Sequence, residues 1–344
     1  MNSLHINEAA FVLILMLMVS CTANTSEEKA AKARPVAEFD PLPSWSDGVT
    51  KSAIIDYVND ITNEQGENFI SIPDRIATFD NDGTLWSEQP LYFQFLFALD
   101  RIKRMAPAHA EWRNKQPFKA ILENDTNALM KQGEKGVLQL VMTTHAGMST
   151  DEFERIVTEW ISTARHPTKG KPYTELVYQP MLELIQYLQD NKFKVFIVSG
   201  GGIEFMRPWV EHVYGIPRDQ VIGSSIKTKY EYSDGNAVLK RLPEIDFIDD
   251  KEGKPVGIHR FIGRKPVFAA GNSDGDLQMM RWADSNPLKN FQLYVHHTDS
   301  VREWAYDRKS HIGTFNEALD ESKEKGWVLI DMAKDWELIY PGAN

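Results

Sequence analysis

One short apolar segment constrains the fold of this chain more than any other part of the sequence. Residues 76–79 read Ile-Ala-Thr-Phe and are followed at once by Asp80-Asn81-Asp82-Gly83. An apolar, partly β-branched run of this length predicts a buried strand of a parallel sheet. Ligands of open α/β sheets bind at the carboxyl ends of such strands, so Asp80 and Asp82 are expected where a site would form. Asp-Asn-Asp-Gly also favours a simple turn, which stays an alternative for this stretch taken alone.

Further apolar runs recur along the chain, with segments of helical spacing between them. Strands that alternate with helices form a parallel sheet covered on both faces, so the sequence predicts a doubly wound α/β core. Residues 88–178 show helical spacing without convincing alternation, which predicts a helical cap inserted after the first strand. The core is then expected to comprise residues 46–87 and 179–344. More strands are expected at 193–198, 221–223, 267–270 and 293–295, and helices at 47–63, 181–188 and 202–214.

The first 45 residues carry a separate signal. Residues 9–20 form an uncharged apolar run that is too short to cross a bilayer but suits an export signal. Cys21, the one cysteine of the chain, follows directly, so no intramolecular disulfide can form. This pattern resembles a bacterial lipoprotein signal over residues 1–21, which implies export to the cell envelope and a lipid anchor at Cys21, on the periplasmic side in a Gram-negative cell. A short amphipathic tail is the alternative, and residues 22–45 are expected to form a flexible tether.

The charge of the chain limits its partners. A formal net charge of -11 argues against a general nucleic-acid-binding protein, which needs a basic face. It does not exclude a small anionic substrate, because a few local cations and a metal ion can outweigh the net field.

Polar residues follow three of the expected strands. The first strand supplies Asp80 and Asp82, and the second ends in Ser199 and three glycines that precede a helix. Such a loop can offer backbone N–H groups to an anion, although a flexible loop needs no ligand. The third strand is followed by Asn272, Asp274 and Asp276, whose oxygens suit Mg²⁺. The alternative is that these residues form only an Asx turn and a helix cap. Carboxyl ends of parallel strands meet at one edge, so these groups are expected to converge.

At this point the chain resembles a known family. Asp80-Asn81-Asp82-Gly83-Thr84-Leu85 is similar to the first motif of the haloacid dehalogenase superfamily, Asp-x-Asp-Gly-Thr-Leu. The other three motifs follow in the family's order, and the helical insertion stands where the phosphoserine-phosphatase-like branch has its type 1 cap. The matching segments are Val198-Ser199-Gly200, Lys254 with Ile258, and residues 271–276 with Met279.

The resemblance implies Mg²⁺-dependent hydrolysis of a small phosphorylated metabolite through an aspartyl-phosphate intermediate. Asp80 would be the nucleophile, Asp82 the general acid and base, and Lys254 the cation that offsets phosphate charge. Lys251 and, less plausibly, Lys265 compete with Lys254 for that position. The expected phosphate-binding residues are Ser199, Gly200, Gly83 and Thr84, and the expected metal ligands are Asp80, Asp82, Asn272 and Asp276, with Asp274 as an alternative.

Two other functions stay open from the sequence. One is phosphoryl transfer to a second metabolite, as in a mutase, and the other is a non-catalytic binding lipoprotein that keeps the fold. The intact Asp80, Asp82, Ser199 and Lys254 argue against the second, while Asn272 keeps it open, since the family usually has an acidic ligand at its position.

The substrate is expected to contact the segment after the first motif. Gln89 stands where phosphoserine phosphatases have a glutamate that reads the substrate amine, with Glu88 beside it. Three aromatic residues of this segment could line the mouth of the site or pack in the core. Adjacent His296 and His297 point to opposite sides of a strand, so they are not expected to share a metal. The aromatic residues are Trp86, Tyr92 and Phe93.

Overall fold

The computed structural model describes residues 40–342. The expected signal at 1–21 and most of the tether at 22–45 lie outside these residues. Within residues 40–342, no helix combines the length and the apolar composition of a membrane span.

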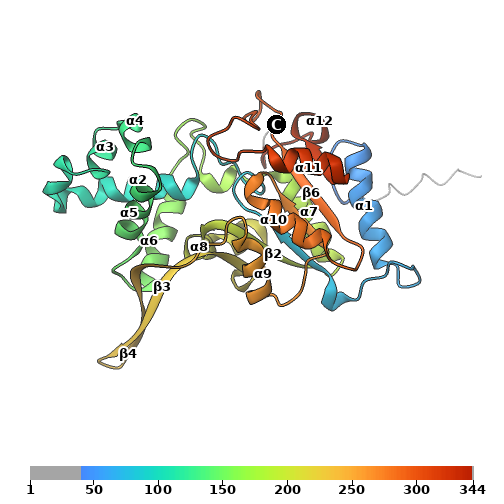
Figure 1. Cartoon of the computed structure of the whole chain (residues 1–344), viewed down its shortest axis with the longest axis horizontal. Helices are drawn as coiled ribbons and strands as arrows, with labels where there is room; N and C mark the ends of the chain where they lie inside the picture. Colours follow the sequence, from blue (N-terminus) through green and yellow to red (C-terminus); the bar gives the residue numbers. More distant parts are fainter. Residues whose placement is uncertain (1–39, 343–344) are drawn as a thin grey trace, which may run out of the picture. The chain divides into compact units, whose positions relative to one another are not determined.

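A sheet of seven strands forms the centre of the described chain (Figure 1). Its order is β4-β3-β2-β1-β5-β6-β7, with β1 in the middle, and every neighbouring pair is parallel except β3 and β4. This confirms the predicted doubly wound α/β core. The strands are β1 (Ile76–Phe79), β2 (Lys194–Gly202), β3 (Val221–Ser233), β4 (Asn236–Phe247), β5 (Phe268–Gly271), β6 (Phe291–His296) and β7 (Val328–Asp331).

Both faces of the sheet are buried around its middle strand, and β1 shows how the sequence achieves this. Alternate residues of a strand point to opposite faces. Ala77 and Phe79 therefore belong to one hydrophobic cluster and Ile76 to the other, and all four residues of β1 are buried. Each large apolar side chain buried in this way contributes about 1.5–3 kcal/mol relative to leaving it in water.

Helices cover each of the two faces. The first cluster includes side chains from α1 (Val49–Thr62), α7 (Gln179–Asp190) and α8 (Ile203–Tyr214), and the second includes side chains from α9 (Gly253–Phe261), α10 (Leu277–Asp284) and α11 (Glu317–Lys325). The helices expected at 47–63, 181–188 and 202–214 are thus confirmed as α1, α7 and α8. A last short helix, α12 (Met332–Asp335), follows β7, and one-turn 3₁₀ segments connect several elements.

A helical insertion separates β1 from α7. It comprises α2 (Phe93–Met105), α3 (Phe118–Leu122), α4 (Thr126–Met130), α5 (Gly133–His145) and α6 (Thr150–Thr163). These helices lie together on the side of the sheet opposite α1 in Figure 1. Part of it has a core of its own, in which Trp112 stacks on Phe118 with ring centroids 4.4 Å apart. The insertion therefore lies after the first strand, as the sequence predicts.

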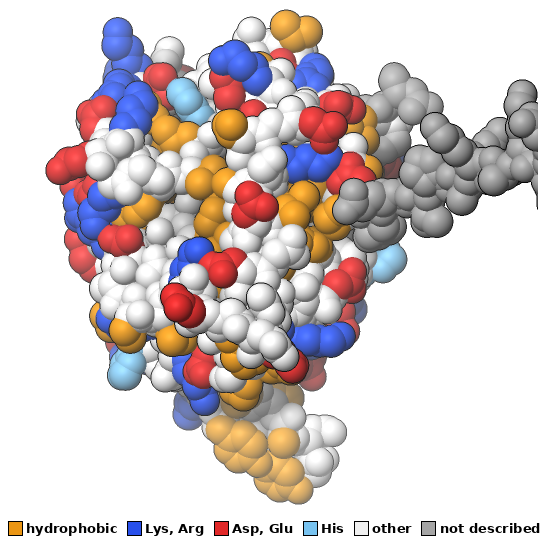
Figure 2. All heavy atoms as spheres, turned by 90° about the vertical axis from the view of Figure 1, so that its right-hand side faces the viewer, with side chains coloured by type: hydrophobic (Ala, Val, Ile, Leu, Met, Phe, Trp, Pro, Cys, Tyr) orange, Lys and Arg blue, Asp and Glu red, His pale blue; other side chains and the backbone are white. Residues whose placement is uncertain are grey.

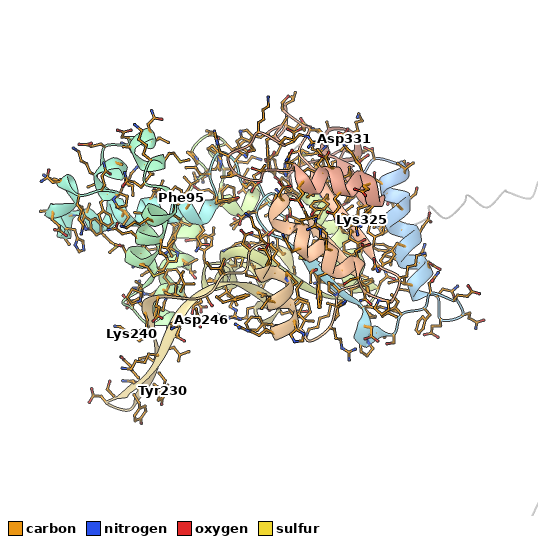
Figure 3. All side chains as sticks on the ribbon, viewed as in Figure 1. Phe95, Tyr230, Lys240, Asp246, Lys325 and Asp331 are labelled. Atoms are coloured by element: carbon orange, nitrogen blue, oxygen red, sulfur yellow. The ribbon has the colours of Figure 1, made fainter. Side chains whose placement is uncertain are left out.

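Strands β3 and β4 run past the sheet as a two-stranded ribbon. The sequence predicts a strand only over 221–223, whereas β3 continues to Ser233 and pairs with β4 from Ser225 onward. The ribbon was missed because most of its residues are exposed and polar, so it lacks an apolar run. Figure 3 shows Tyr230 near the far end of the ribbon, and Tyr230 and Tyr232 are 63% and 65% exposed. Figure 2 shows hydrophobic side chains gathered at the lower end of the molecule.

The ribbon is also tied to the helical insertion. Gly147 N donates to Arg241 O, and Arg241 N donates to Met148 O, both at 2.9 Å. The Arg241 side chain donates from Nε to His145 O at 2.6 Å and lies over the ring of Phe153. The base of the ribbon therefore packs between the sheet and the insertion.

Candidate active site

The turn after β1 places the first two carboxylates. Asp80 N donates to Ala270 O in β5 at 2.9 Å, so the strand alignment continues as far as Asp80. Gly83 adopts a φ of 75°, the left-handed region that suits glycine, and its N–H donates to Trp86 O at 2.8 Å. This tight turn holds Asp80 and Asp82 at the carboxyl end of the middle strand of the sheet.

Lys254, in α9, joins two segments that are far apart in the sequence. Its Nζ lies 2.6 Å from Asp80 Oδ1, 2.7 Å from Asp276 Oδ1 and 2.7 Å from Val198 O. Lys254 is 1% exposed, so these charge-assisted hydrogen bonds form out of water, where they are strong. The nucleophile position, the cation and the acidic residue after β5 are therefore in direct contact.

The pKa values of this cluster follow from burial and charge. Burial raises the pKa of Asp80 well above its usual value, the charge of Asp276 raises it further, and Lys254 opposes both. Burial works against the charge of Lys254, but the Asp276 and Asp80 carboxylates outweigh it and raise its pKa. Lys254 is thus a permanent cation near neutral pH, as a group that offsets phosphate charge must be.

Asp82 occupies a different environment from Asp80. Its Oδ1 accepts a hydrogen bond from Trp86 Nε1 at 2.8 Å. Burial raises the pKa of Asp82 to about 6, and the hydrogen bond from Trp86 limits the rise. A carboxyl with this pKa can donate a proton and take one back near neutral pH, which is what general acid and base catalysis requires. Two carboxyls two residues apart therefore have different proton affinities.

The irregular Ser-Gly loop that forms the end of β2, residues 199–202, lies beside Asp82. Ser199 is 1% exposed, and its Oγ accepts a hydrogen bond from Gly201 N at 3.0 Å. A methyl group on Gly201 would lie 3.2 Å from Ser199 Oγ and 3.6 Å from Asp82 Oδ2, so this loop and Asp82 share one space. Gln94, from α2 of the insertion, reaches the same loop, where its Oε1 accepts from Gly202 N at 2.7 Å. The helical insertion therefore contributes a side chain at the site.

The loop after β5 is fixed by Asp276. Asp276 Oδ2 accepts from Asn272 N at 2.9 Å and from Ser273 N at 3.1 Å, while Oδ1 faces Lys254. Ser273 Oγ accepts in turn from Gly275 N, which completes a reciprocal cap at the start of the following helix. Both carboxylate oxygens of Asp276 are thus engaged by protein donors.

Asn272 is held next to Asp80 by a shared hydroxyl. Thr84 Oγ1 lies 3.2 Å from Asn272 Oδ1 and 3.4 Å from Asp80 Oδ2. A hydroxyl has one proton and can donate to only one of these oxygens at a time. A carboxylate oxygen and an amide oxygen that converge in this way are the hard donors that Mg²⁺ prefers. The donor set fits such a cation, although no cluster of three His, Cys, Asp or Glu side chains suited to a metal occurs in the described residues.

Gly83 and Thr84 make their hydrogen bonds within the site and the turn that surrounds it. Gly83 N donates to Trp86 O, and Thr84 N donates to Asn81 O at 3.2 Å, so both N–H groups are used inside the turn. The Thr84 hydroxyl is directed at Asn272 and Asp80. These donors close the turn, and the role of both residues as phosphate ligands stays a prediction.

The residues left as alternatives by the sequence lie away from the cluster. Asp274 Oδ1 accepts from the backbone at the start of α11, from Asn316 N, which precedes the helix, and from Ala318 N, each at 2.9 Å. Lys251 is exposed, and Lys265 Nζ donates to Ser285 Oγ at the surface. Lys254 is thus the lysine that contacts the two carboxylates.

The aromatic residues after the first motif divide between site and core. Trp86 donates to Asp82 and stacks on Trp209 with ring centroids 4.3 Å apart, and Phe93 is fully buried in the core. Tyr92 is 38% exposed, and its hydroxyl accepts from Gly313 N at 3.4 Å. Gln89 Nε2 donates to Ser310 Oγ at 3.2 Å, so the residue at the glutamate position of the resembled phosphatases contacts a loop of this chain instead.

A second group of buried polar residues lies behind the turn. Glu88 is 1% exposed, and its Oε1 accepts from Asn272 Nδ2 at 2.9 Å and from Tyr306 OH at 2.7 Å. Burial raises the pKa of Glu88 well above its usual value, and Tyr306 opposes this rise. His297 is also buried, with Nε2 2.7 Å from Gly83 O. His296 points elsewhere, 3.7 Å from Asp307 Oδ2, so the adjacent histidines do face opposite sides.

Sequence reasoning missed the roles of Glu88, Gln94 and Tyr306. Glu88 and Gln94 stand in a segment dense in aromatic residues, where an isolated polar residue gives the one available signal. Tyr306 comes more than 200 residues later along the chain, and nothing in its local sequence points to Glu88. These contacts depend on the tertiary packing of the insertion and the C-terminal segment onto the turn.

A model of the haloacid dehalogenase-like hydrolase family matches residues 77–281 of the chain. This range contains Asp80, Ser199, Lys254 and Asp276, so the segments that supply the candidate site residues described above lie within the match. No curated protein sequence matches the chain.

Solved structures resemble the chain at low identity. A conserved protein of unknown function from Anaerococcus prevotii is 16% identical, with a TM-score of 0.46, covering 80% of this chain and 88% of its own. A protein of unknown function from Bordetella pertussis is also 16% identical, with a TM-score of 0.45, covering 75% of this chain and 98% of its own. A probable phosphoserine phosphatase from Vibrio cholerae is 14% identical, with a TM-score of 0.37 and coverages of 72% and 64%.

Proposed function

Since the chain belongs to the haloacid dehalogenase-like hydrolases, we propose that it is a Mg²⁺-dependent phosphatase that acts on a small phosphorylated molecule. One observation carries this proposal: Lys254 contacts Asp80 at the end of β1, and Asp82 with its pKa of about 6 stands two residues away. A nucleophilic carboxylate, a fixed cation and a separate proton donor are the groups that hydrolysis of a phosphate ester by this route requires.

The reaction divides into two displacements. A carboxylate oxygen of Asp80 forms a bond to phosphorus, the bond between phosphorus and the ester oxygen breaks, and Asp82 gives its proton to the departing alkoxide. Asp82, now a carboxylate, takes a proton from water as that water attacks the aspartyl phosphate, which releases inorganic phosphate and restores Asp80. The elevated pKa of Asp82 supports this exchange, because the proton is present for the first step and can be recovered in the second.

The remaining groups of the site are proposed to bind the phosphate and the Mg²⁺ ion. Ser199 Oγ and the Gly200 N–H are proposed to hold phosphate oxygens, and Lys254 offsets their charge. Asp80, the Asp82 carbonyl and Asn272 would hold Mg²⁺, which would neutralise negative charge on the phosphoryl group. Asp276, also expected from the sequence to bind the metal, pairs with Lys254 through Oδ1 and accepts two backbone N–H bonds through Oδ2, and its place among the metal ligands stays a prediction.

A panel of phosphate esters, assayed with Mg²⁺ and with EDTA, tests the proposal. We expect Mg²⁺-dependent release of inorganic phosphate, and Asp80→Asn should abolish it while the protein keeps its melting temperature. The assay is repeated with added alcohols. A hydrolase releases inorganic phosphate under these conditions, whereas a phosphotransferase transfers the phosphoryl group to the alcohol. Turnover by Asp80→Asn at a rate comparable to that of the unaltered protein would remove Asp80 as the nucleophile.

The place of action is a separate proposal. We propose that the protein is exported and held at the cell envelope by a lipid on Cys21, because the preceding apolar run resembles a lipoprotein signal. Radioactive palmitate should label the protein in bacterial cells, and Cys21→Ser should lose the label. Equal labelling of both would contradict the anchor at this residue.

A further inference from the structure

Glu88 is a buried carboxylate whose donors carry no charge. It lies eight residues after Asp80 and is 1% exposed. In the described part of the chain, the donors to its Oε1 are the Asn272 amide at 2.9 Å and the Tyr306 hydroxyl at 2.7 Å. A buried carboxylate without a cation is costly, so its retention here calls for a reason.

The backbone closes tightly around this carboxylate. A methyl group on Gly83 would lie 2.0 Å from Asn272 Nδ2 and 2.6 Å from Glu88 Oε1. A methyl group on Gly313 would lie 1.8 Å from the same oxygen. Both glycines have positive φ angles, of 75° and 61°. The carboxylate, the amide and the two loops therefore form a packed unit, in which Glu88 has little freedom to turn away from Asn272.

Glu88 determines which end of the Asn272 amide faces Asp80. An asparagine side chain has a donor end and an acceptor end. Since Glu88 accepts from Nδ2, the Oδ1 atom is turned toward Thr84 Oγ1, which is also 3.4 Å from Asp80 Oδ2. Within residues 40–342, Glu88 Oε1 is the acceptor found for Asn272 Nδ2, so loss of the carboxylate would remove the contact that distinguishes this orientation from the reverse one.

Burial favours the neutral form of Glu88, whereas a divalent cation bound at Asn272 would favour the ionised form, so the carboxylate would bring a negative charge close to Asn272 when the cation is present. An amide oxygen can coordinate a divalent cation but adds no charge, and Asp276 already balances Lys254. A carboxylate hydrogen-bonded to a ligand increases the electron density on that ligand and fixes its geometry, as the outer partners of metal ligands commonly do.

We propose that Glu88 is a positioning residue for the cation: it turns Asn272 Oδ1 toward the Mg²⁺ position and provides, through the amide, the negative charge that Asn272 lacks. The inference rests on the proposed function, since the cation is the Mg²⁺ of that reaction. It assigns Glu88 to metal affinity rather than to contact with the substrate.

Mg²⁺ affinity, measured without turnover, tests this role. The melting temperature is followed as Mg²⁺ is added to protein stripped with EDTA, and the dissociation constant is taken from the concentration dependence. Glu88→Gln keeps the shape but removes the charge, and its amide can present a donor to Asn272. We expect it to weaken Mg²⁺ binding about 10- to 100-fold, the usual effect of losing an outer partner of a metal ligand.

A charge exchange provides the sharper test. In the double variant Asn272→Asp/Glu88→Gln, the carboxylate stands at position 272 and the amide at position 88, so the pair keeps one charge and one donor. This variant should bind Mg²⁺ within about threefold of the unaltered protein if the charge is what matters. Tyr306→Phe is the matched control: it removes the other hydrogen bond to Glu88 but keeps the carboxylate and its contact with Asn272, so affinity should change by less than about threefold.

The outcomes separate this inference from the proposed function. A folded Glu88→Gln protein that binds Mg²⁺ as tightly as the unaltered protein would overturn the role of Glu88, even while Mg²⁺-dependent hydrolysis stands. If Glu88→Gln fails to fold, the double variant decides: loss of Mg²⁺ binding by more than about tenfold would overturn the role as well. An unaltered protein that neither binds Mg²⁺ nor hydrolyses any ester would remove the function and the inference together.

Discussion

Replacement of Lys254 by methionine should destabilise the protein strongly. Lys254 Nζ lies 2.6 Å from Asp80 and 2.7 Å from Asp276, and the residue is 1% exposed. Methionine keeps much of the side-chain length but removes the charge, which leaves two carboxylates close together out of water. Removing one partner of a buried ion pair costs about 3–5 kcal/mol of unfolding free energy. We expect a loss of this size near neutral pH, together with loss of hydrolysis.

The loss should depend on pH in a defined direction. The folded-state pKa of Asp80 is already raised above the ordinary 3.8, and loss of the cation raises it further. A carboxyl with a raised folded-state pKa destabilises the protein fully above that pKa, and the penalty disappears as the pH falls toward the unfolded-state value. The deficit of Lys254→Met should therefore shrink in mildly acid buffer.

Urea unfolding at neutral and mildly acid pH measures both effects. Lys289→Met is the matched control, because Lys289 pairs with Asp60 at the surface, where water and salt weaken the attraction. Its unfolding midpoint should stay close to that of the unaltered protein at both pH values. A Lys254→Met protein as stable as the unaltered protein near neutral pH would refute the account of a cation that holds two buried carboxylates.

Three further predictions concern the turn after β1. Since burial raises the pKa of Asp82 to about 6, kcat/KM for an ester with a poor leaving group should fall as the pH rises through about 6, and a flat profile would count against Asp82 as the acid. Trp86→Phe removes a donor to the Asp82 carboxylate, so that inflection should move to higher pH; an unchanged inflection would contradict the role of Trp86. Gly83→Ala should abolish Mg²⁺ binding, because its methyl group would lie 2.0 Å from Asn272 Nδ2, whereas Gly170→Ala, with a similar φ and open space around it, should retain binding.

The strand ends were predictable from the sequence because their signals are local. An apolar run followed by Asp80, another followed by Ser199 and a third followed by Asn272 each report a buried strand and the residues beyond it. The parallel order of β2, β1 and β5 then brings these ends to one edge of the sheet. The doubly wound core and the gathering of these groups therefore follow from short stretches read one at a time.

The parts that could not be predicted depend on contacts between distant segments. The pairing of Glu88 with Asn272 joins residues 184 positions apart, and the contact of Lys254 with Asp276 Oδ1 forms only when α9 packs against the loop after β5. The ribbon of β3 and β4 escaped prediction for another reason. Its strands are stabilised by pairing with each other along their backbones, with little burial, so apolar periodicity does not reveal them.

The attachment of that ribbon couples two parts of the protein mechanically. Arg241 in β4 exchanges backbone hydrogen bonds with Gly147 and Met148, at the loop between α5 and α6, while β3 pairs with β2 beside Ser199. While those hydrogen bonds are formed, a displacement of the loop between α5 and α6 must be accompanied by a displacement of the ribbon. A small rotation at the base of the ribbon moves its far end through a larger distance. A fluorescent dye attached at position 230, near that far end (Figure 3), would therefore report such a coupled movement in real time.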